Sequence, residues 1–309
     1  MRVRRSLLDS FGNDACSVRP WRKIADPARP GSVSGSIITW MELDVTDRTA
    51  VRSAVEDNGI TNIIHLAGLQ VPFCRANPSL GAAVNVVGTA NVFEAARHAD
   101  ITNPAYASSI AVMGPASLYP DRSIVDDVPL DPNTLYGVYK VANEKTAKVF
   151  WNDWQVPSVG LRPYNVYGVG RDQGMTADIA KAVLAAAADR PFHIRFGGSQ
   201  ALQHANDVAQ IFIAASRSGH QGAAACNLRN TVMDVADVVD LIKTQVPGAK
   251  ITFDAVTLLP FPSDLDDSLL RNILGNVPHT PIADAIAGDL EQSRTLLASD
   301  KIRLGQLDE

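Results

Sequence analysis

The 309-residue chain carries 28 Lys and Arg side chains against 33 Asp and Glu, which gives a formal net charge of −5. With a pI near 5.7 and charges of both signs spread along the chain, the sequence lacks the basic surface of a nucleic-acid-binding protein. A hydrophobic content of 46% excludes a disordered chain, and no apolar run approaches the ~18–20 residues that a membrane span needs. We therefore expect a folded cytoplasmic protein with no nucleic-acid or membrane partner.

Short β-rich segments alternate with alanine-rich helical segments, the pattern that builds a parallel sheet covered by helices on both faces. Predicted strands span residues 37–43, 62–66, 105–108 and 158–162. Predicted helices span residues 49–57, 80–98, 136–154, 176–188 and 207–216. The fold class is therefore α/β, with a smaller lobe after about Gly168. The three cysteines are far apart and form no CxxC motif, so we expect neither a disulfide framework nor a metal site.

Tyr136 and Lys140 stand four residues apart at the start of a predicted helix, so their side chains lie one turn apart on the same face. A phenol with a pKa near ~10 acts as a base at neutral pH only where a neighbouring cation favours the phenolate, and the Lys140 ammonium is such a cation. Upstream, an apolar strand ends in Ser108 and Ser109, at the sheet edge where open α/β sheets bind ligands. The pattern indicates acid/base chemistry, although a Tyr–Lys pair alone also occurs on exposed helix surfaces.

Further segments follow in a fixed order around these residues: IHLAG at residues 64–68, NVVGT at 85–89 and LRPYNVYG at 161–168. Together they resemble the extended short-chain dehydrogenase/reductase superfamily, specifically its NAD-dependent epimerase/dehydratase branch, over residues 44–227. The resemblance implies a Rossmann-type doubly wound parallel sheet with a smaller, interleaved C-terminal substrate lobe. We expect the dinucleotide-binding domain over residues 1–170 and the substrate lobe mainly over residues 171–309, with returns to the sheet domain around residues 200–230.

The resemblance implies that Tyr136 is the catalytic acid/base, that Lys140 lowers its pKa and holds the nicotinamide ribose, and that Ser109 orients the reacting oxygen. Ser108 is the alternative to Ser109, and its other interpretation is a strand-end serine bonded to backbone. Besides Tyr136 and Lys140, the residues placed against the cofactor are Asp26, Asp44, Val45, Leu66, Ala67, Gly68, Asn85 and Pro163. Besides Ser109, those placed on the substrate side are Asn165 and Gln200.

Asp26 decides which nicotinamide cofactor the sequence favours. It stands at the end of a predicted second strand, where a carboxylate binds the ribose hydroxyls of NAD, so NAD is the expected cofactor. A loop Asp before Pro27 is an equal alternative, and NADP is therefore not excluded.

Two departures from the family pattern change the interpretation. The family opens with a strand and a glycine-rich turn, whereas this chain opens with an amphipathic helical segment over residues 2–11. We therefore expect in-frame upstream codons to encode the strand and the glycine turn. Ile110 and Ala111 stand where dehydratases of this branch carry an Asp–Glu pair, which disfavours a sugar 4,6-dehydratase.

A third departure concerns the substrate. Gln200 stands where nucleotide-sugar enzymes of the branch carry an Arg that grips the diphosphate. A neutral amide there favours a small free sugar or sugar acid, unless Arg171, Arg195 or Arg229 binds a diphosphate from another direction.

Two further motifs are interpreted as structural. His65 lies inside an apolar strand, so we expect a hydrogen-bonded structural histidine and not a general base. Gly168, Gly170 and Gly174 have the spacing GxGxxxG, which is not that of a dinucleotide fingerprint, and they predict a loop near the substrate.

The sequence thus predicts an NAD-dependent oxidoreductase or epimerase of a carbohydrate, in which Tyr136 takes the hydroxyl proton and Ser109 stabilises the forming carbonyl. A UDP-sugar 4-epimerase is the alternative, and a non-catalytic or truncated relative is the alternative of another class. The expected partner is a small carbohydrate, and a homodimer stays open.

Overall fold

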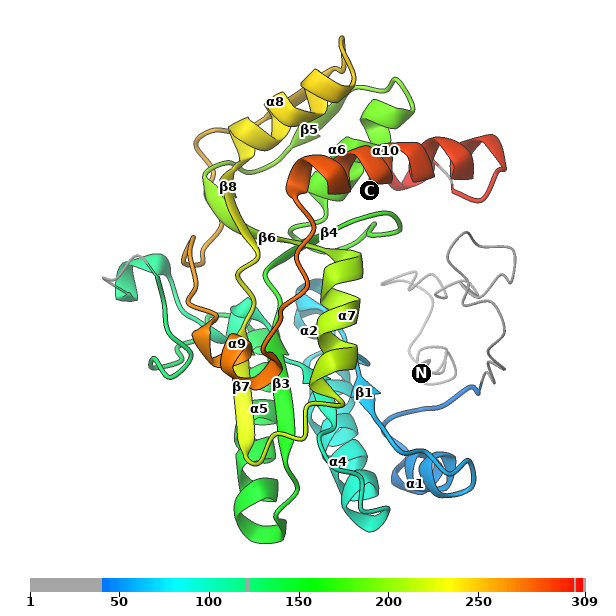
Figure 1. Cartoon of the computed structure of the whole chain (residues 1–309), viewed down its shortest axis with the longest axis vertical. Coiled ribbons are helices and arrows are strands. Elements are labelled where there is room, and N and C mark those ends of the chain that lie inside the picture. Colours follow the sequence, from blue (N-terminus) through cyan, green and yellow to red (C-terminus); the bar gives the residue numbers. More distant parts are fainter. Residues whose placement is uncertain (1–40, 120–122, 303, 308–309) are drawn as a thin grey trace.

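The computed structural model describes residues 41–119, 123–302 and 304–307. Its larger part is built on a parallel sheet in the order β1-β2-β3-β7 (Figure 1), formed by Ile64–His65, Ala105–Ala107, Ser158–Arg162 and Ala223–Asn227. The expected α/β class and Rossmann-type sheet are confirmed.

Helices cover both faces of this sheet, as the doubly wound arrangement requires. On one face, α4 (Gly88–His98) and α5 (Leu135–Trp154) bury Phe93 and Phe150 against Tyr106 of β2. On the other face, α7 (Ala205–Ala215) and α9 (Ser268–Leu274) pack against β3 and β7. The helix α1 (Arg48–Glu56) packs on α4.

The second part of the molecule lies above the sheet in Figure 1 and has its own apolar cluster. The strand β6 (Ser199–His204) pairs in parallel with β4 (Asn165–Tyr167) and antiparallel with β8 (Thr231–Asp234). A two-stranded sheet joins β5 (Phe192–Ile194) to β9 (Ile251–Phe253), and the helices are α6 (Asp178–Ala187), α8 (Val235–Gln245) and α10 (Ile282–Ala298). The boundary near residue 170 stays a prediction.

Most predicted elements lie within two residues of the observed ones, but two differ more. Of the strand predicted over residues 37–43, only 41–43 are described, and they contain a single bridge residue, Glu42. The helix predicted over residues 80–98 is in fact three consecutive pieces: α3 (Pro78–Ala82), the π-helix η2 (Ala83–Val87) and α4. The remaining short elements are α2 (Val71–Ala76), η3 (Ile110–Val112), η4 (Ala116–Leu118) and η5 (Leu304–Leu307).

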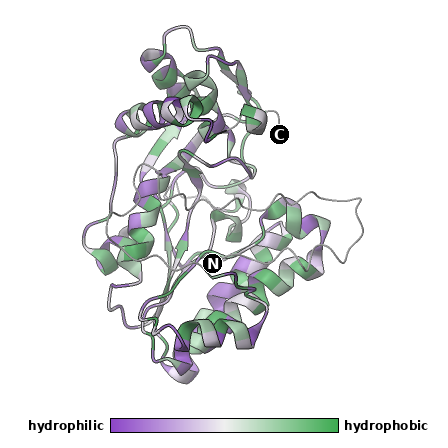
Figure 2. Ribbon diagram, turned by 90° about the vertical axis from the view of Figure 1, so that its right-hand side faces the viewer, coloured by the Kyte–Doolittle hydropathy of each residue, from purple (hydrophilic) through white to green (hydrophobic). Residues whose placement is uncertain are grey.

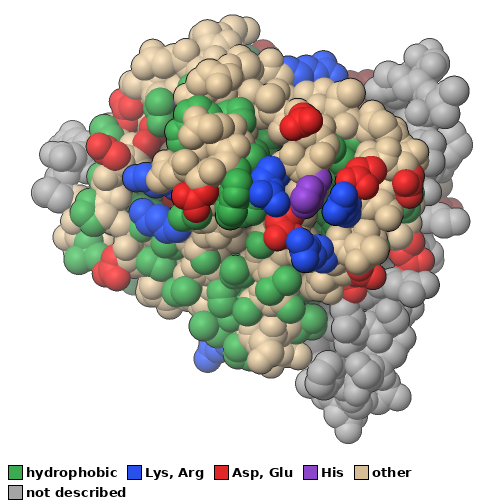
Figure 3. Space-filling view, turned by 90° about the horizontal axis from the view of Figure 1, so that it is seen from below, with side chains coloured by type: hydrophobic (Ala, Val, Ile, Leu, Met, Phe, Trp, Pro, Cys, Tyr) green, Lys and Arg blue, Asp and Glu red, His purple; other side chains and the backbone are tan. Residues whose placement is uncertain are grey.

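The surface helices show hydrophobic and hydrophilic residues on different sides (Figure 2), as expected for helices that pack on a core with one stripe. Seen from below, the face of the sheet domain carries basic and acidic side chains interspersed (Figure 3). Within the described ranges, no helix is long and apolar enough to cross a membrane, and no group of three or more His, Cys, Asp and Glu side chains could hold a metal ion.

His65 is buried in β1, with 4% of its surface exposed, and packs against α4. Its Nε2 lies 3.0 Å from the Thr89 hydroxyl, which itself donates to the carbonyl of Asn85 at 2.6 Å. Because a hydroxyl has one proton to donate, Nε2 is the donor to Thr89 and Nδ1 is the bare nitrogen. Burial, reinforced by the charge of Lys140, lowers the pKa of His65 to about 3. These contacts are those of the structural histidine that we expected.

A buried ion pair joins α5 to β3. Arg162 donates through Nε and Nη2 to both carboxylate oxygens of Glu144, each at 2.8 Å, and both side chains are almost fully enclosed. The same guanidinium reaches the Asp126 carbonyl at 2.8 Å and the Asn227 side chain at 3.2 Å, and Ser108 donates its hydroxyl to Glu144. The hydrogen bonds around this pair therefore link two central strands, a helix and a long loop.

We predict that His65 steepens the acid sensitivity of the fold. Its pKa is lower in the folded than in the unfolded chain, so the unfolded state binds more protons between pH 6.5 and 3. As the pH falls through this window, the protonation of His65 should lower the free energy of unfolding by up to about 1.4 kcal/mol per pH unit. Urea unfolding at pH 6.5 and 5 should show a shallower loss for His65→Gln, while the exposed His193→Gln control retains the wild-type slope.

We predict that Glu144→Gln lowers the free energy of unfolding by about 3–5 kcal/mol, because it leaves the Arg162 guanidinium buried without its counter-charge. The matched control is Glu56→Gln, which breaks the exposed pair of Arg52 and Glu56 on α1 and should cost at most about 0.5 kcal/mol. Equal losses for the two variants in urea titrations would contradict the importance of the buried pair.

Candidate active site

The expected catalytic side chains meet where the carboxyl ends of β1 and β2 face the first turns of α5. Thr134 starts α5 by accepting a hydrogen bond from the Gly137 amide at 3.0 Å. Gly137 lies against η3 so closely that a Cβ there would stand 2.1 Å from the carbonyl oxygen of Ala111. This close contact places Tyr136 near Ser109, whose hydroxyl opposes the effect of burial on the pKa of the Tyr136 phenol.

Lys140 is buried one turn further along α5. Its Nζ donates to the carbonyl of Ala107 at 2.7 Å and lies 5.5 Å from the centroid of the Tyr136 ring. Burial lowers the pKa of Lys140 to about 8, opposed by the negative charge of Glu144. The ammonium therefore keeps its proton at pH 7.

The pKa of Tyr136 differs from the lowered value that the sequence suggested. Burial raises the pKa of this phenol, while the hydrogen bond from Ser109 and the charge of Arg171 act in the opposite direction. The cation that acts on the pKa of Tyr136 is thus Arg171 and not Lys140.

The two adjacent serines have different surroundings. The hydroxyl of Ser108 is buried and bonded to Glu144, within the ion-pair network. Ser109 accepts from the Ala111 amide at 3.1 Å, and its hydroxyl acts on the pKa of Tyr136. The choice of Ser109 over Ser108 as the orienting hydroxyl stays a prediction.

The residues expected around the cofactor form a cradle after β1. Asn85 lies in the π-turn η2, where its Nδ2 donates to the carbonyls of Gly81 at 2.9 Å and Leu69 at 3.2 Å. Its Oδ1 is buried and has no hydrogen-bond partner. A Cβ on Gly68 would stand 2.7 Å from that oxygen and 3.5 Å from Nζ of Lys140. An unsatisfied acceptor, an ammonium and bare backbone suit a ligand rich in hydroxyl groups, such as a ribose.

The remaining residues expected to bind the cofactor differ in their exposure to solvent. Leu66, next to Ala67 and Gly68, is 59% exposed at the end of β1 and is open to a ligand. Asp44 is turned onto its own loop, accepting from the amide and hydroxyl of Thr46 at 2.9 and 2.8 Å. The buried Val45 packs against Gly88, and the Pro163 carbonyl accepts from Ile110 at 3.0 Å. Asp26 lies outside the described residues.

The two expected substrate-side residues are brought together. Asn165 on β4 donates through Nδ2 to Oε1 of Gln200 on β6, and both side chains are buried. The Oδ1 of Asn165 has no partner. Ile110 and Ala111 are buried in an apolar cluster with Tyr164, so no carboxylate stands at these two positions.

Sequence reasoning missed Glu144 and the π-turn around Asn85. Glu144 follows Lys140 by the same interval that separates Tyr136 from Lys140, so one helix face carries all three. That spacing could have revealed Glu144. The π-turn has no comparable sequence pattern.

Comparison with known proteins identifies the family of the chain. The chain matches the NAD dependent epimerase/dehydratase family over residues 10–228. It is 30% identical over 245 residues to the UDP-glucose 4-epimerase of Mycolicibacterium smegmatis, covering 74% of each chain. It is 34% identical over 148 residues to an uncharacterized protein of Methanocaldococcus jannaschii, covering 47% of this chain and 45% of that protein. Against several curated relatives the match therefore spans less than half of their length.

Solved structures share the fold at lower identity. A partial consensus L-threonine 3-dehydrogenase superposes with a TM-score of 0.75 at 21% identity, over 84% of this chain and 86% of that one. A putative epimerase from Burkholderia cenocepacia gives 0.73 at 24% identity, over 94% and 93%. MoeE5 in complex with UDP-glucose and NAD gives 0.70 at 23% identity, over 83% and 86%. The extent of the family match shows that the chain belongs to the NAD dependent epimerase/dehydratase family.

Proposed function

We propose that the chain is an NAD-dependent oxidoreductase or epimerase that acts on a secondary hydroxyl of a sugar, sugar acid or nucleotide sugar. The observation that carries this proposal is that Ser109 and the buried Lys140 ammonium both lie near the Tyr136 side chain, at the carboxyl edge of the parallel sheet. A phenol, an orienting hydroxyl and a cation are the groups that proton transfer to and from a carbinol oxygen needs.

NAD is the cofactor of this family, and the cradle after β1 fits its ribose end. Gly68 lets bare backbone lie close to Asn85 and Lys140, the unpaired Oδ1 of Asn85 is an acceptor for a ribose hydroxyl, and the Lys140 ammonium is a donor. When bound there, NAD supplies the acceptor for a hydride from the carbinol carbon.

Tyr136 then accepts the proton of the substrate hydroxyl. As the C–H electron pair leaves the carbon, the O–H proton passes to the Tyr136 oxygen and the carbon–oxygen double bond forms. Ser109, which accepts from the Ala111 amide, has its proton free to share between Tyr136 and the substrate oxygen. Because burial raises the pKa of Tyr136, oxidation should be favoured by higher pH and carbonyl reduction by lower pH.

Two alternative functions are a UDP-sugar 4-epimerase and a non-catalytic relative. The likeness to the M. smegmatis UDP-glucose 4-epimerase favours a UDP-sugar 4-epimerase, in which the ketone turns over and is reduced on its other face. The neutral, buried Gln200 argues against it, because a diphosphate there would lack a bidentate guanidinium. A non-catalytic relative would not need Ser109, Tyr136 and Lys140 together.

A substrate panel tests the proposal directly. NAD reduction is followed at 340 nm with aldoses and sugar acids, beside a coupled epimerase assay with UDP-glucose and UDP-galactose. Turnover of any of these substrates supports the proposal, and the identity of the substrate separates dehydrogenase from epimerase. NAD binding without turnover across the panel would favour the non-catalytic alternative.

We predict that Tyr136→Phe lowers kcat by about 10²–10⁴-fold while NAD affinity changes only a few-fold, because the phenol acts on the substrate proton. Lys140→Met should reduce both turnover and NAD affinity, since its ammonium lies between Tyr136 and the Gly68 cradle. Steady-state kinetics and calorimetric NAD titration measure the two effects. The control is Tyr139→Phe, which removes a hydroxyl bonded to the Pro78 carbonyl and should leave kcat unchanged.

A further inference from the structure

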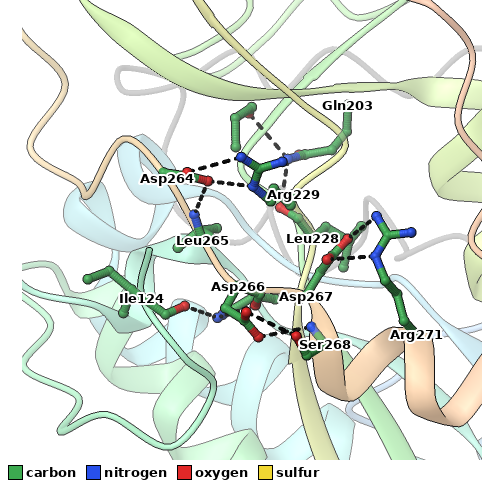
Figure 4. Close-up of polar contacts among 12 residues, drawn as sticks. Ile124, Gln203, Leu228, Arg229, Asp264, Leu265, Asp266, Asp267, Ser268 and Arg271 are labelled. Carbon is green, nitrogen blue, oxygen red and sulfur yellow. Dashed lines mark hydrogen bonds and ion pairs between the residues drawn. The ribbon is translucent and has the colours of Figure 1, made fainter. Parts of the chain in front are cut away.

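Arg171, Arg195 and Arg229 are the three arginines that the sequence offered as anion-binding residues. Two of them already form ion pairs with carboxylates. Arg195 forms a two-point ion pair with the buried Asp178, at 2.8 and 2.7 Å. Arg229 forms another with Asp264, at 2.7 and 3.1 Å, and Figure 4 shows its guanidinium held by that carboxylate. Neither is free to bind a ligand without first losing its partner.

Arg171 is different. It lies partly buried in the loop between β4 and α6, where its Nη2 donates to the hydroxyl of Thr176 at 3.0 Å. Its Nε is buried and has no partner, and within the described part of the chain no carboxylate lies at ion-pair distance from it. Burial lowers the pKa of Arg171, opposed by the charge of Asp172. A half-buried cation without a counter-ion is costly unless an anion joins it.

The surroundings of Arg171 place it at the active site. Gly174, with a φ of +100°, lets the loop close on Gln70, because a Cβ there would stand 2.6 Å from Oε1 of Gln70 and 3.5 Å from Nη2 of Arg171. Gln70 directly precedes α2 and ends the loop that carries Gly68. On its other side, the charge of Arg171 acts on the Tyr136 phenol. The guanidinium therefore lies beside the loop that follows the cofactor cradle, near enough to the proposed acid/base for its charge to act there.

We propose that Arg171 forms an anion subsite that binds a carboxylate located close to the reacting carbon, so that the substrate is a hydroxy acid such as a uronic or other sugar acid. This rests on the proposed function. A guanidinium fork matches a carboxylate in two parallel hydrogen bonds. A nucleotide sugar carries its diphosphate across the ring from the 4-hydroxyl, so a cation beside the tyrosine suits a carboxylate next to that hydroxyl and not the diphosphate.

The test uses matched ligands that differ only in a carboxylate in place of a hydroxymethyl group: D-galacturonate against D-galactose, and UDP-glucuronate against UDP-glucose. Dissociation constants are measured by calorimetry with the full chain. In at least one pair, the wild type should bind the acid about tenfold or more tightly than the neutral partner, as expected for charge-assisted hydrogen bonds. Arg171→Gln should remove this preference while leaving the affinity for the neutral ligand within twofold.

Arg171→Lys keeps the charge without the fork, so it should keep part of the preference and serves if Arg171→Gln fails to fold. Arg217→Gln removes an exposed arginine in the turn after α7 and should keep the whole preference. Equal affinity for acid and neutral ligands in the wild type, or a preference that survives in Arg171→Gln, would overturn the subsite.

Failure of the proposed reaction looks different. If the acid preference depends on Arg171 but no ligand of the panel is turned over, the subsite stands and the proposed chemistry fails. If acid and neutral ligands are turned over equally well by the wild type, and Arg171→Gln changes neither, the chemistry stands and the subsite fails.

Discussion

The buried pair of Glu144 and Arg162 is the interaction on which the geometry of the site depends. Tyr136, Lys140 and Glu144 lie on one face of α5, and Glu144 is fixed to β3 by two hydrogen bonds of 2.8 Å. A helix held by such a fork cannot rotate about its axis without separating two buried charges. The direction in which Tyr136 and Lys140 point is therefore set by a residue two turns away from the reacting hydroxyl.

A steric constraint at the start of α5 completes this arrangement. The Gly137 backbone lies so close to the Ala111 carbonyl that any side chain there would displace the helix or η3. The same η3 begins at Ile110, directly after Ser109, whose hydroxyl accepts from the Ala111 amide. Ion pair and close contact thus act at different points of one helix, and together they fix the separation of the Ser109 and Tyr136 hydroxyls.

Sequence reasoning succeeded where the determinant is local or periodic. The strand Ser158–Arg162 was placed with its observed ends because a short apolar run buried on both faces has a clear pattern. The Tyr136–Lys140 spacing likewise follows from helix geometry. The π-turn of Asn85 was missed, because an i→i+5 hydrogen bond leaves the apolar periodicity of the segment almost unchanged. The effect of Arg171 on Tyr136 was also missed, because it depends on a loop folding back across 35 residues.

On the substrate side, a neutral amide stands at position 200 and a guanidinium at position 171, and their surroundings explain the difference. Asn165 donates to Gln200 across β4 and β6, and this neutral hydrogen bond between two buried amides needs no counter-ion. A guanidinium at position 200 would place a charge inside that sheet, where 1% of the Gln200 surface is exposed. At position 171 the charge lies in a glycine-containing loop that Gly168, Gly170 and Gly174 turn through positive φ values, which allows a cation to approach an incoming anion. The loop, and not the sheet, is where this fold can present a positive charge to its substrate.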